Sequence, residues 1–409
     1  MRSVPLVLLE PVMPATAARI PRGRAASMLG AALFALVVAV QPVAAVSWTG
    51  EARISSASVF RPTTLRTGAS RAVVVWQHGS YAYLKRTTDG GVTWLPRVTL
   101  ASGIGVGVSA SASGSSVDVV YTKRATCAST GDPVWRLWYR RSLNGGATWS
   151  TPKALIGACS SAADHAIARH ANGQVSVAWT GYSSGRILVR TSIDGGATFR
   201  AAVQAAGTTD WEPGNQPFYR GTPAIAIGTK GTTYIAYSSA VNRLSVRRSS
   251  DRGATWSSAT TLTASAAGPE IDLLATDGRA VVGYMRSVSG QMQAVYRRTV
   301  DRGATWSTTR QTVALQAGQF SLWPRFAYRS GVLVMETKAG VAGDSPVWYR
   351  TSSDFGLTWS ARHRVSVERV EDSDPEPGGI ALLDGTVLAT YTENRGTGSE
   401  GMWVRRGTP

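Results

Sequence analysis

The sequence predicts an all-β fold, a seven-bladed β-propeller of four-stranded antiparallel blades. An eight-residue motif of the form S-x-D-x-G-x-T-W occurs six times, at separations of 55, 50, 57, 50 and 53 residues. A period of this size is typical of propellers and solenoids. Seven β-rich segments accompany the six motifs, and no amphipathic helical pattern follows residue 46.

Residues 1–45 precede the predicted domain and have the composition of a signal peptide. A 13-residue apolar run, Met28–Val40, follows three arginines, and Val43-Ala44-Ala45 provides the small residues of a signal-peptidase site. The run is shorter than the ~18 residues that a membrane span needs. We expect cleavage after Ala45, secretion to the extracellular space and no stable membrane insertion afterwards. An uncleaved signal that anchors the protein in the membrane is the alternative.

Residues 46–409 form the single predicted propeller domain, which is strongly basic. Removal of residues 1–45 takes away four Arg and one Glu and leaves a net charge of +15. Basic charge on an exported protein favours acidic partners. We therefore expect acidic glycans or other anionic surface ligands, no specific nucleic acid, and a monomer. A basic surface without a specific ligand is the alternative.

The first folded segment, SWTGEARIS (47–55), resembles the end of a repeat such as TWSSATTL (255–262). The front half of the motif is missing there. At the other end of the chain, the last unit (376–406) has three strands and stops where a motif should begin. We predict that residues 47–55 supply its fourth strand, so that the ring closes non-covalently and leaves no exposed sheet edge.

Each complete motif is expected to form the turn between the third and fourth strands of a blade. Its acidic or amide position can accept backbone N–H groups and stabilise the turn. This position is occupied by Asp89, Asn144, Asp194, Asp251, Asp301 and Asp354. Asn144 has no charge, which indicates a geometric rather than a chemical role. The closing Trp or Phe is large enough to fill the seam between neighbouring sheets.

The motif resembles the Asp-box, or bacterial neuraminidase repeat, of sialidases and related β-propellers. The resemblance implies Asp-boxes on the rim opposite the active site, and an exo-sialidase-like glycoside hydrolase if the protein is an enzyme. It also implies a six-bladed propeller, the number in sialidases of this family, as the alternative to the seven blades counted here.

The loop face opposite the motifs is the expected ligand face. Cys127 lies in a loop of the second blade and Cys159 in the link to the third, both on this face. Two cysteines in an exported protein favour a disulfide. We predict the pair Cys127–Cys159.

The first strands of the blades supply the residues expected to surround the central channel. Their alignment gives an inner row and a row two residues earlier. The inner row is Pro62, Val108, Ile167, Ile225, Asp272, Arg325 and Gly379, and the outer row is Phe60, Val106, His165, Pro223, Glu270, Trp323 and Pro377. Glu270, Asp272 and Arg325 interrupt an apolar pattern, and unpaired buried charge is costly. They are expected either to pair with one another or to hold a ligand.

Two loops offer further candidates. The link TTDWEPGNQPFYRG (208–221) combines Trp211, Glu212, Tyr219 and Arg220, which suit a sugar ring, or form a loop folded over its own Trp. The segment ERVEDSDPE (368–376) gathers five carboxylates that could bind Ca²⁺ or form a solvated acidic loop. These carboxylates belong to Glu368, Glu371, Asp372, Asp374 and Glu376. No other cofactor is expected, since the four His form no HExxH arrangement.

The resemblance to sialidases also implies roles for single residues. Those enzymes bind the substrate carboxylate with three Arg and use an Asp acid/base with a Glu-activated Tyr nucleophile. Their Phe/Tyr-Arg-Ile-Pro motif resembles Phe60-Arg61-Pro62, which lacks the Ile, and one residue less turns a strand side chain to the other face. By loop position the expected catalytic residues are Glu270, Asp272 and Glu212. The expected substrate-binding residues are Arg61, Arg325, Arg286, Trp211, Tyr219, Arg220 and Trp323.

A basic residue recurs four positions before each motif Asp or Asn and in the last unit. It is Lys85, Arg140, Arg190, Arg247, Arg297, Arg350 and Arg405. Its recurrence with the scaffold favours structural pairing or a solvated rim over a specific site. The two functional readings are a secreted propeller that recognises, and possibly hydrolyses, acidic glycans, and a non-catalytic protein-binding or assembly scaffold. Three converging Arg with a Tyr–Glu pair would favour sialidase activity.

Overall fold

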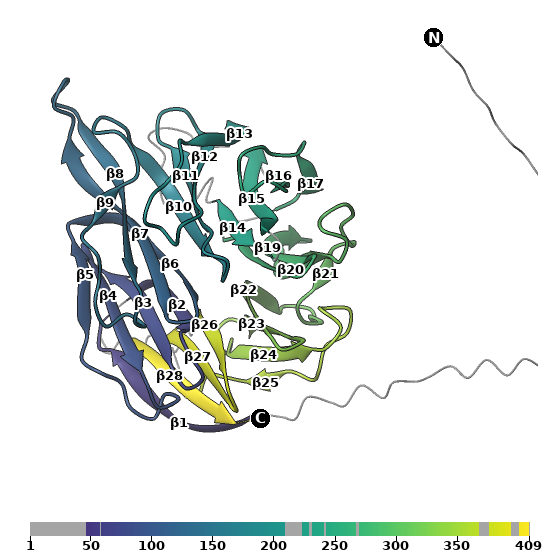
Figure 1. The fold of residues 1–409 in the computed structure, drawn as a ribbon. Coiled ribbons are helices and arrows are strands. Elements are labelled where there is room, and N and C mark those ends of the chain that lie inside the picture. The colour runs from purple at the N-terminus through teal and green to yellow at the C-terminus, as the bar shows by residue number, and fades with distance from the viewer. Residues whose placement is uncertain are drawn as a thin grey trace, which may run out of the picture. The chain divides into compact units, whose positions relative to one another are not determined.

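The computed structural model describes residues 46–57, 59–208, 223–228, 231–240, 243–266, 270–367, 376–393 and 401–408. These residues form seven sheets of four strands. The sheets are blades of a ring, because the innermost strand of each blade packs against those of its two neighbours (Figure 1). The seven-bladed propeller is confirmed, and the six-bladed alternative is wrong.

Blades 1 to 4 each run outward from the channel in chain order. Blade 1 comprises β2 (Phe60–Arg66), β3 (Ala72–His78), β4 (Tyr81–Thr87) and β5 (Val98–Ser102). Blade 2 comprises β6 (Ile104–Ser113), β7 (Ser116–Thr126), β8 (Pro133–Ser142) and β9 (Lys153–Ala154). Blade 3 comprises β10 (Ala162–Arg169), β11 (Val175–Gly181), β12 (Arg186–Ser192) and β13 (Val203–Thr208). Blade 4 comprises β14 (Ala224–Ile227), β15 (Thr233–Ala240), β16 (Arg243–Ser249) and β17 (Thr260–Thr263).

Blades 5 and 6 repeat this order, and blade 7 is shared between the two ends of the chain. Blade 5 comprises β18 (Asp272–Thr276), β19 (Arg279–Val288), β20 (Gln291–Thr299) and β21 (Arg310–Gln311). Blade 6 comprises β22 (Phe320–Arg329), β23 (Val332–Gly340), β24 (Val347–Ser352) and β25 (His363–Arg364). Blade 7 comprises β26 (Glu376–Leu383), β27 (Thr386–Glu393), β28 (Gly401–Thr408) and β1 (Ser47–Ser55).

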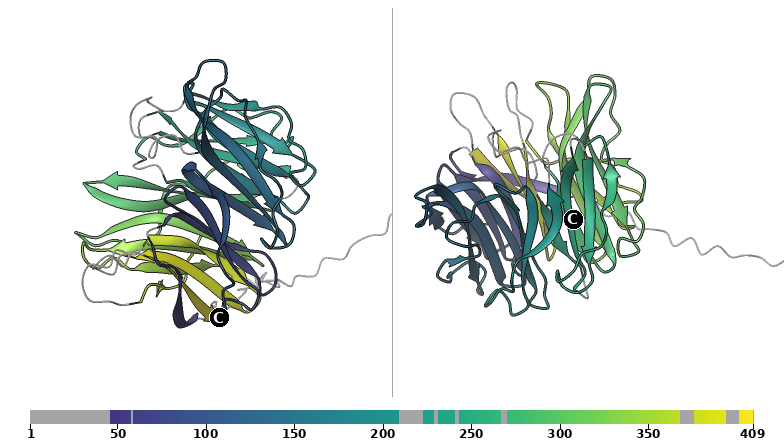
Figure 2. Two further views of the ribbon diagram at one scale, coloured as in Figure 1. Left: turned by 90° about the vertical axis from the view of Figure 1, so that its left-hand side faces the viewer. Right: turned by 90° about the horizontal axis from the view of Figure 1, so that it is seen from above.

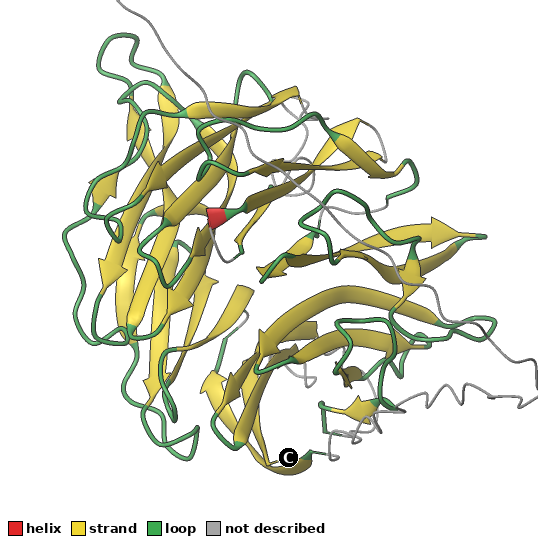
Figure 3. Cartoon of the chain, turned by 45° about the vertical axis from the view of Figure 1, so that its right-hand side comes forward, coloured by secondary structure: helices red, strands yellow, loops and turns green. Residues whose placement is uncertain are grey.

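Strands and connecting loops make up almost all of the described chain (Figures 2 and 3). The second strands are the most deeply buried, as in β3 and β11, where nearly every residue lacks solvent contact. Both faces of these strands are covered by neighbouring blades, which explains their continuous apolar runs. The described residues contain no helix with the length and hydrophobicity to cross a bilayer.

Strand β1 closes the ring as predicted. It pairs antiparallel with β28, with Ser47 opposite Thr408 and Ala52 opposite Val404. Val46, just before β1, is buried in the core between blades 6 and 7. The segment 47–55 is therefore the fourth strand of the last blade.

Each seam between neighbouring blades holds a hydrophobic cluster, and six of these clusters contain one aromatic ring from the end of a motif. The six motif rings are Trp94, Trp149, Phe199, Trp256, Trp306 and Trp359. At the seventh seam, between blades 6 and 7, Trp48 of β1 takes the equivalent place. The predicted packing role of the motif ring is confirmed at six seams, and Trp48 has the same role at the seventh.

The motif turns share one set of hydrogen bonds. In the first turn, Thr93 N donates to Asp89 Oδ1 at 3.0 Å, and Gly91 N donates to Thr87 Oγ1 at 2.9 Å. Asn144 accepts from Thr148 N in the same way, at 2.9 Å. The uncharged Asn144 preserves the turn, so the side chain acts through geometry, as predicted.

The recurrent basic residues join blades to one another. Arg350 Nη1 donates to Thr312 O at 3.1 Å, and Arg405 Nη1 donates to Val365 O at 2.8 Å, each reaching back to the outer edge of the preceding blade. The following Arg reaches forward to the motif turn of the next blade, as when Arg141 Nη1 donates to Gly195 O at 2.8 Å. These contacts support structural pairing over a solvated rim.

Candidate functional site

The innermost strands of the blades surround a central cavity of about 420 Å³. All seven residues of the predicted inner row line it, from Pro62 in blade 1 to Gly379 in blade 7. Of the outer row, His165, Pro223 and Glu270 line it. Alignment of the first strands thus located the channel wall correctly.

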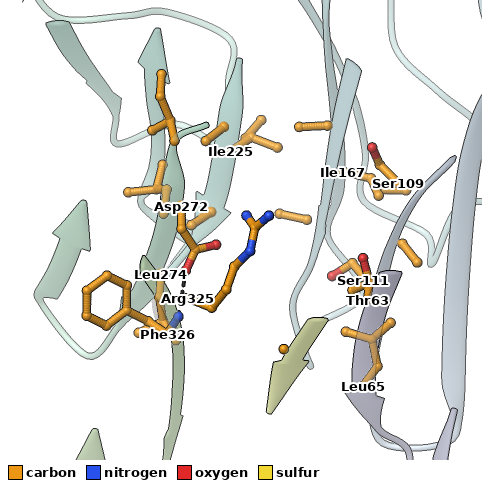
Figure 4. A pocket seen from close by; sticks show the side chains of 18 of the residues that line it. Thr63, Leu65, Ser109, Ser111, Ile167, Ile225, Asp272, Leu274, Arg325 and Phe326 are labelled. Carbon is orange, nitrogen blue, oxygen red and sulfur yellow. Dashed lines mark hydrogen bonds between the residues drawn. The ribbon is translucent and has the colours of Figure 1, made fainter. Parts of the chain in front are cut away.

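Arg325 extends its guanidinium into the cavity (Figure 4). It lies on β22 beside Asp272 of β18, and the charges of the two side chains interact. In the described part of the chain the guanidinium has neither a hydrogen bond nor a carboxylate within 4.0 Å. It is therefore a cation that faces the cavity with its donors available to a ligand.

Asp272 is held by the neighbouring blade. Its Oδ2 accepts a hydrogen bond from Phe326 N at 2.6 Å (Figure 4). Desolvation raises the pKa of Asp272, and the charge of Arg325 and this hydrogen bond oppose the rise. Asp272 can therefore carry a proton at a higher pH than an exposed carboxyl group.

The opposite wall of the cavity presents hydroxyl groups. Thr63, Ser109 and Ser111 lie across the cavity from Arg325 (Figure 4). Ser109 Oγ donates to His165 O at 2.9 Å, and Ser111 Oγ accepts from Arg169 N at 2.9 Å. Among the described residues, the cavity thus places the Arg325 guanidinium opposite a wall of hydroxyl groups.

Arg169, at the end of β10, is the second arginine in the cavity wall, and its charge is neutralised. Its Nη1 lies 2.6 Å from Asp118 Oδ2 in a buried ion pair. Tyr139 Oη also donates to Asp118. Burial raises the pKa of both Asp118 and Tyr139. Asp118 interrupts the second-strand segment SVDVVYT, a signal that the comparison of first strands alone did not use.

Glu336 was also missed by the sequence analysis. It lies on β23 directly opposite Arg325 and is fully buried. Its Oε2 accepts from Gly379 N of blade 7 at 2.9 Å. The sequence feature that could have revealed Glu336 is a carboxylate within the apolar segment GVLVMET.

The remaining predicted residues lie apart from the cavity or outside the described residues. Trp323, with a φ of 53°, and Arg286, whose Nη2 lies 3.4 Å from Gln293 Oε1, do not line the cavity. Arg61 lies in β2, but its side chain is outside the description. Trp211, Glu212, Tyr219 and Arg220 lie outside the described residues.

The predicted disulfide between Cys127 and Cys159 is present. It joins the loop between β7 and β8 to the link that enters blade 3. Of the acidic segment, Glu376 is exposed at the start of β26, whereas Glu368, Glu371, Asp372 and Asp374 lie outside the described residues. Among the residues that are described, no three His, Cys, Asp or Glu side chains are grouped as a metal site. Calcium binding by this segment stays a prediction.

The arrangement implied by sialidases is not assembled by the described residues. Within them, Arg169 and Arg325 are the arginines of the cavity wall, and no Tyr lines it. A Tyr–Glu pair does exist, since Tyr391 Oη donates to Glu51. It joins β27 to β1 and lies outside the cavity lining.

Six motif turns, seven aromatic-filled seams and a central cavity thus characterise this seven-bladed β-propeller. Residues 223–406 match the BNR repeat-like domain, which is the Asp-box repeat of neuraminidase type. The sequence has no significant match among curated proteins.

Solved structures show the same fold at low identity. An ulvan lyase of polysaccharide lyase family 25, bound to a saccharide of GlcA and Rha3S, is 11% identical with a TM-score of 0.59, covering 88% of this chain and 95% of its own. A second polysaccharide lyase is 8% identical with a TM-score of 0.54, covering 88% of this chain and 99% of its own. A Hadza microbial sialidase is 13% identical with a TM-score of 0.46, covering 68% of this chain and 63% of its own. At these identities the likeness to the two lyases shows the fold alone.

Proposed function

We propose that this protein recognises an anionic saccharide in its central cavity through Arg325, outside the cell after removal of residues 1–45. The observation that carries the proposal is the Arg325 guanidinium, which enters the cavity and has no hydrogen-bonded partner among the described residues (Figure 4). A planar guanidinium suits carboxylate or sulfate groups, which it can bind through two parallel hydrogen bonds.

The opposite wall supports a saccharide as the carrier of that anion. The Thr63, Ser109 and Ser111 hydroxyls and the apolar side chains between them match the mixed polar and C–H surface of a sugar ring. The ulvan lyase with the same fold is described in complex with a saccharide that contains GlcA and Rha3S. Acidic glycans are therefore our proposed partners, and the class of acidic sugar is left to experiment.

Binding is tested on an array of uronate-, sialate- and sulfate-bearing oligosaccharides with neutral ones for comparison, at low salt. We expect retention of acidic glycans and a loss of affinity of about 10- to 100-fold in Arg325→Gln, since hydrogen bonds to charged groups contribute about 1.5–3 kcal/mol. Arg286→Gln is the matched control, because it removes an arginine outside the cavity lining, and it should bind within about twofold of the wild type.

Absence of binding to every acidic glycan, or equal binding by Arg325→Gln, would refute the proposal. Binding of a protein partner without glycan binding would favour a scaffold role instead. Hydrolysis is measured on the same array. Turnover that Asp272→Asn abolishes while binding persists would assign Asp272 as an acid/base group and add catalysis to recognition.

A further inference from the structure

Glu336 occupies a strand position that is uncharged in other blades. It pairs with Tyr349 of β24, three residues before the first motif residue, Ser352. The residues with this pairing in blades 1 to 5 are Val75, Val120, Ala178, Ala236 and Gly283. A carboxyl group at this position in blade 6 is therefore not required by the fold.

The Glu336 carboxyl group is only half satisfied. Oε2 accepts from Gly379 N at 2.9 Å, whereas Oε1 has no hydrogen-bond partner among the described residues. Leaving a buried polar atom unpaired costs about 1–3 kcal/mol. Because native proteins rarely leave a buried carboxyl oxygen unpaired, we expect Glu336 to have a functional role that offsets this cost in stability.

Charged and titratable groups face Glu336 from several packed elements. Arg325 of β22 lies opposite it, Asp272 of β18 interacts with its charge, and Tyr349 of β24 is its other strand neighbour. Strand β26 contributes the Gly379 N–H. Lys338, two residues further along β23, is buried with its ammonium 5.3 Å from the centre of the Trp323 ring.

These neighbours place the ionisation of Glu336 near neutral pH. Desolvation raises its pKa to about 8, the charge of Asp272 adds to the rise, and the Gly379 N–H and Arg325 oppose it. Below that pH the carboxyl group is neutral, and above it Glu336 carries a negative charge that interacts with the charge of Arg325.

We propose that Glu336 is a positioning residue for Arg325, and that ionisation of its carboxyl group withdraws the guanidinium from an anionic ligand in the cavity. The inference rests on the proposed function, because the ligand is the same anionic saccharide. When Glu336 is neutral, the positive charge of Arg325 is available to the ligand. When Glu336 is ionised, its carboxylate competes with the ligand for the Arg325 guanidinium. By linkage, anion binding favours the protonated carboxyl group, so binding above about pH 8 takes up a proton.

The coupling of Glu336 to Arg325 is measured first without ligand. The carboxyl carbons of labelled glutamates are followed by NMR from pH 5 to 10, and the Glu336 signal is assigned by its absence in Glu336→Gln. We expect a midpoint near 8 in the wild type, and a higher midpoint in Arg325→Gln, which removes the stabilising positive charge. A midpoint near the usual value of about 4.3, or one that Arg325→Gln does not move, would overturn the inference.

The effect on the ligand is then measured by calorimetry with a glucuronate-terminated tetrasaccharide between pH 6 and 9.5. Wild-type affinity should fall above pH 8 by up to tenfold per pH unit, the limit for one proton. Glu336→Gln should show no such fall in affinity. If the glutamine side chain perturbs folding, Glu336→Val provides a second test, because valine occupies the equivalent position in blades 1 and 2. Glu393→Gln is the matched control, since Glu393 is another buried second-strand carboxyl outside the cavity lining, and it should keep the wild-type fall.

An equal fall in wild type and Glu336→Gln would overturn the inference while leaving glycan recognition intact. Absence of tetrasaccharide binding at every pH, with the Glu336 midpoint still moved by Arg325→Gln, would support the coupling and count against the proposed function.

Discussion

Gly196 illustrates how closely a single residue of one blade can meet the next. It lies in the third motif turn with a φ of 86°, and a Cβ atom there would be 1.8 Å from Tyr139 Oη of blade 2. Gly196→Ala would therefore displace Tyr139 from Asp118, its buried hydrogen-bond partner. We expect a loss of about 2–4 kcal/mol in the free energy of unfolding, from backbone strain and the weakened Asp118 contact.

Urea unfolding measures this loss. Gly145→Ala is its control, because Gly145 also has a positive φ of 68° but no atom closer than 3.6 Å to the added Cβ. It should lose only about 1 kcal/mol. Equal losses in the two variants would contradict the role assigned to the Tyr139 contact.

The motif carboxylates should make stability depend on acid pH. Hydrogen bonds from Thr93 lower the pKa of Asp89 to about 2. Because this value is below the unfolded value of about 3.9, the contribution is complete above about pH 4 and is lost as the pH falls through about 2. Asp89→Asn should reduce the loss of stability between pH 4 and 2, and Asn144→Asp should increase it, each by a few tenths of a kcal/mol at these exposed sites.

Thermal unfolding across this pH range provides the measurement. A pH profile that neither substitution alters would show that the turns are held without these charges.

The residues of the candidate site were only partly predictable. Asp272 and Arg325 could be found because they interrupt the apolar first strands, where inward positions align from blade to blade. Glu336 acts on Arg325 from the second strand, across a register that a bulge shifts between Leu322 and Arg325. This pairing depends on the strand register, so the sequence shows that Glu336 is unusual in an apolar strand but does not show that Arg325 lies opposite it.

At the scale of elements, the position of β1 as the fourth strand of blade 7 was predictable from the sequence, and its pairing with β28 confirms it. Ile54 follows Trp48 by six residues, as Leu262 follows Trp256. Trp48 fills the seventh seam as the motif rings fill the other six. Blade boundaries followed from the repeat spacing. The register shifts in β2, β6, β10, β22 and β26 did not follow from that spacing.

Trp48 gives a direct test of this closure. Trp48→Ala should lower the free energy of unfolding by about 2–3 kcal/mol, somewhat less than the 3–5 kcal/mol typical of fully buried Trp because the ring is only partly buried. Deletion of residues 46–55 should destabilise the whole domain further. Differential scanning calorimetry measures both.

Leu143→Ala is the control, because Leu143 is 58% exposed, and it should melt within about 1 °C of the wild type. Wild-type melting of the chain that lacks residues 46–55 would contradict the closure by β1.

At the scale of the whole molecule, much of the basic charge belongs to the framework. Arginines of one blade donate to backbone carbonyls of the blades before and after it, as with Arg350, Arg405 and Arg141. The net charge alone is therefore a poor guide to ligand binding. Arg325 differs from these arginines because its donors face the cavity.

Arg350→Gln tests whether an arginine that stabilises the framework also contributes to ligand binding. Its guanidinium donates to Ser360 O at 2.8 Å and to Thr312 O at 3.1 Å. We expect a loss of about 1–3 kcal/mol in unfolding free energy, measured by urea denaturation, with acidic-glycan affinity within about twofold of the wild type. Weaker glycan binding in the folded variant would instead assign the framework arginines to ligand recognition.

The pairing of β1 with β28 also governs when the molecule can finish folding. Thr49 Oγ1 donates to Arg406 O at 2.8 Å, a contact between residues 357 apart in the chain. Strand β1 can therefore pair only after β28 has been synthesised, and such distant contacts form slowly. A chain truncated before Gly401 would leave β1 and β27 as open edges, which invite pairing with other chains. The ring can therefore close only in a chain that has been synthesised through β28.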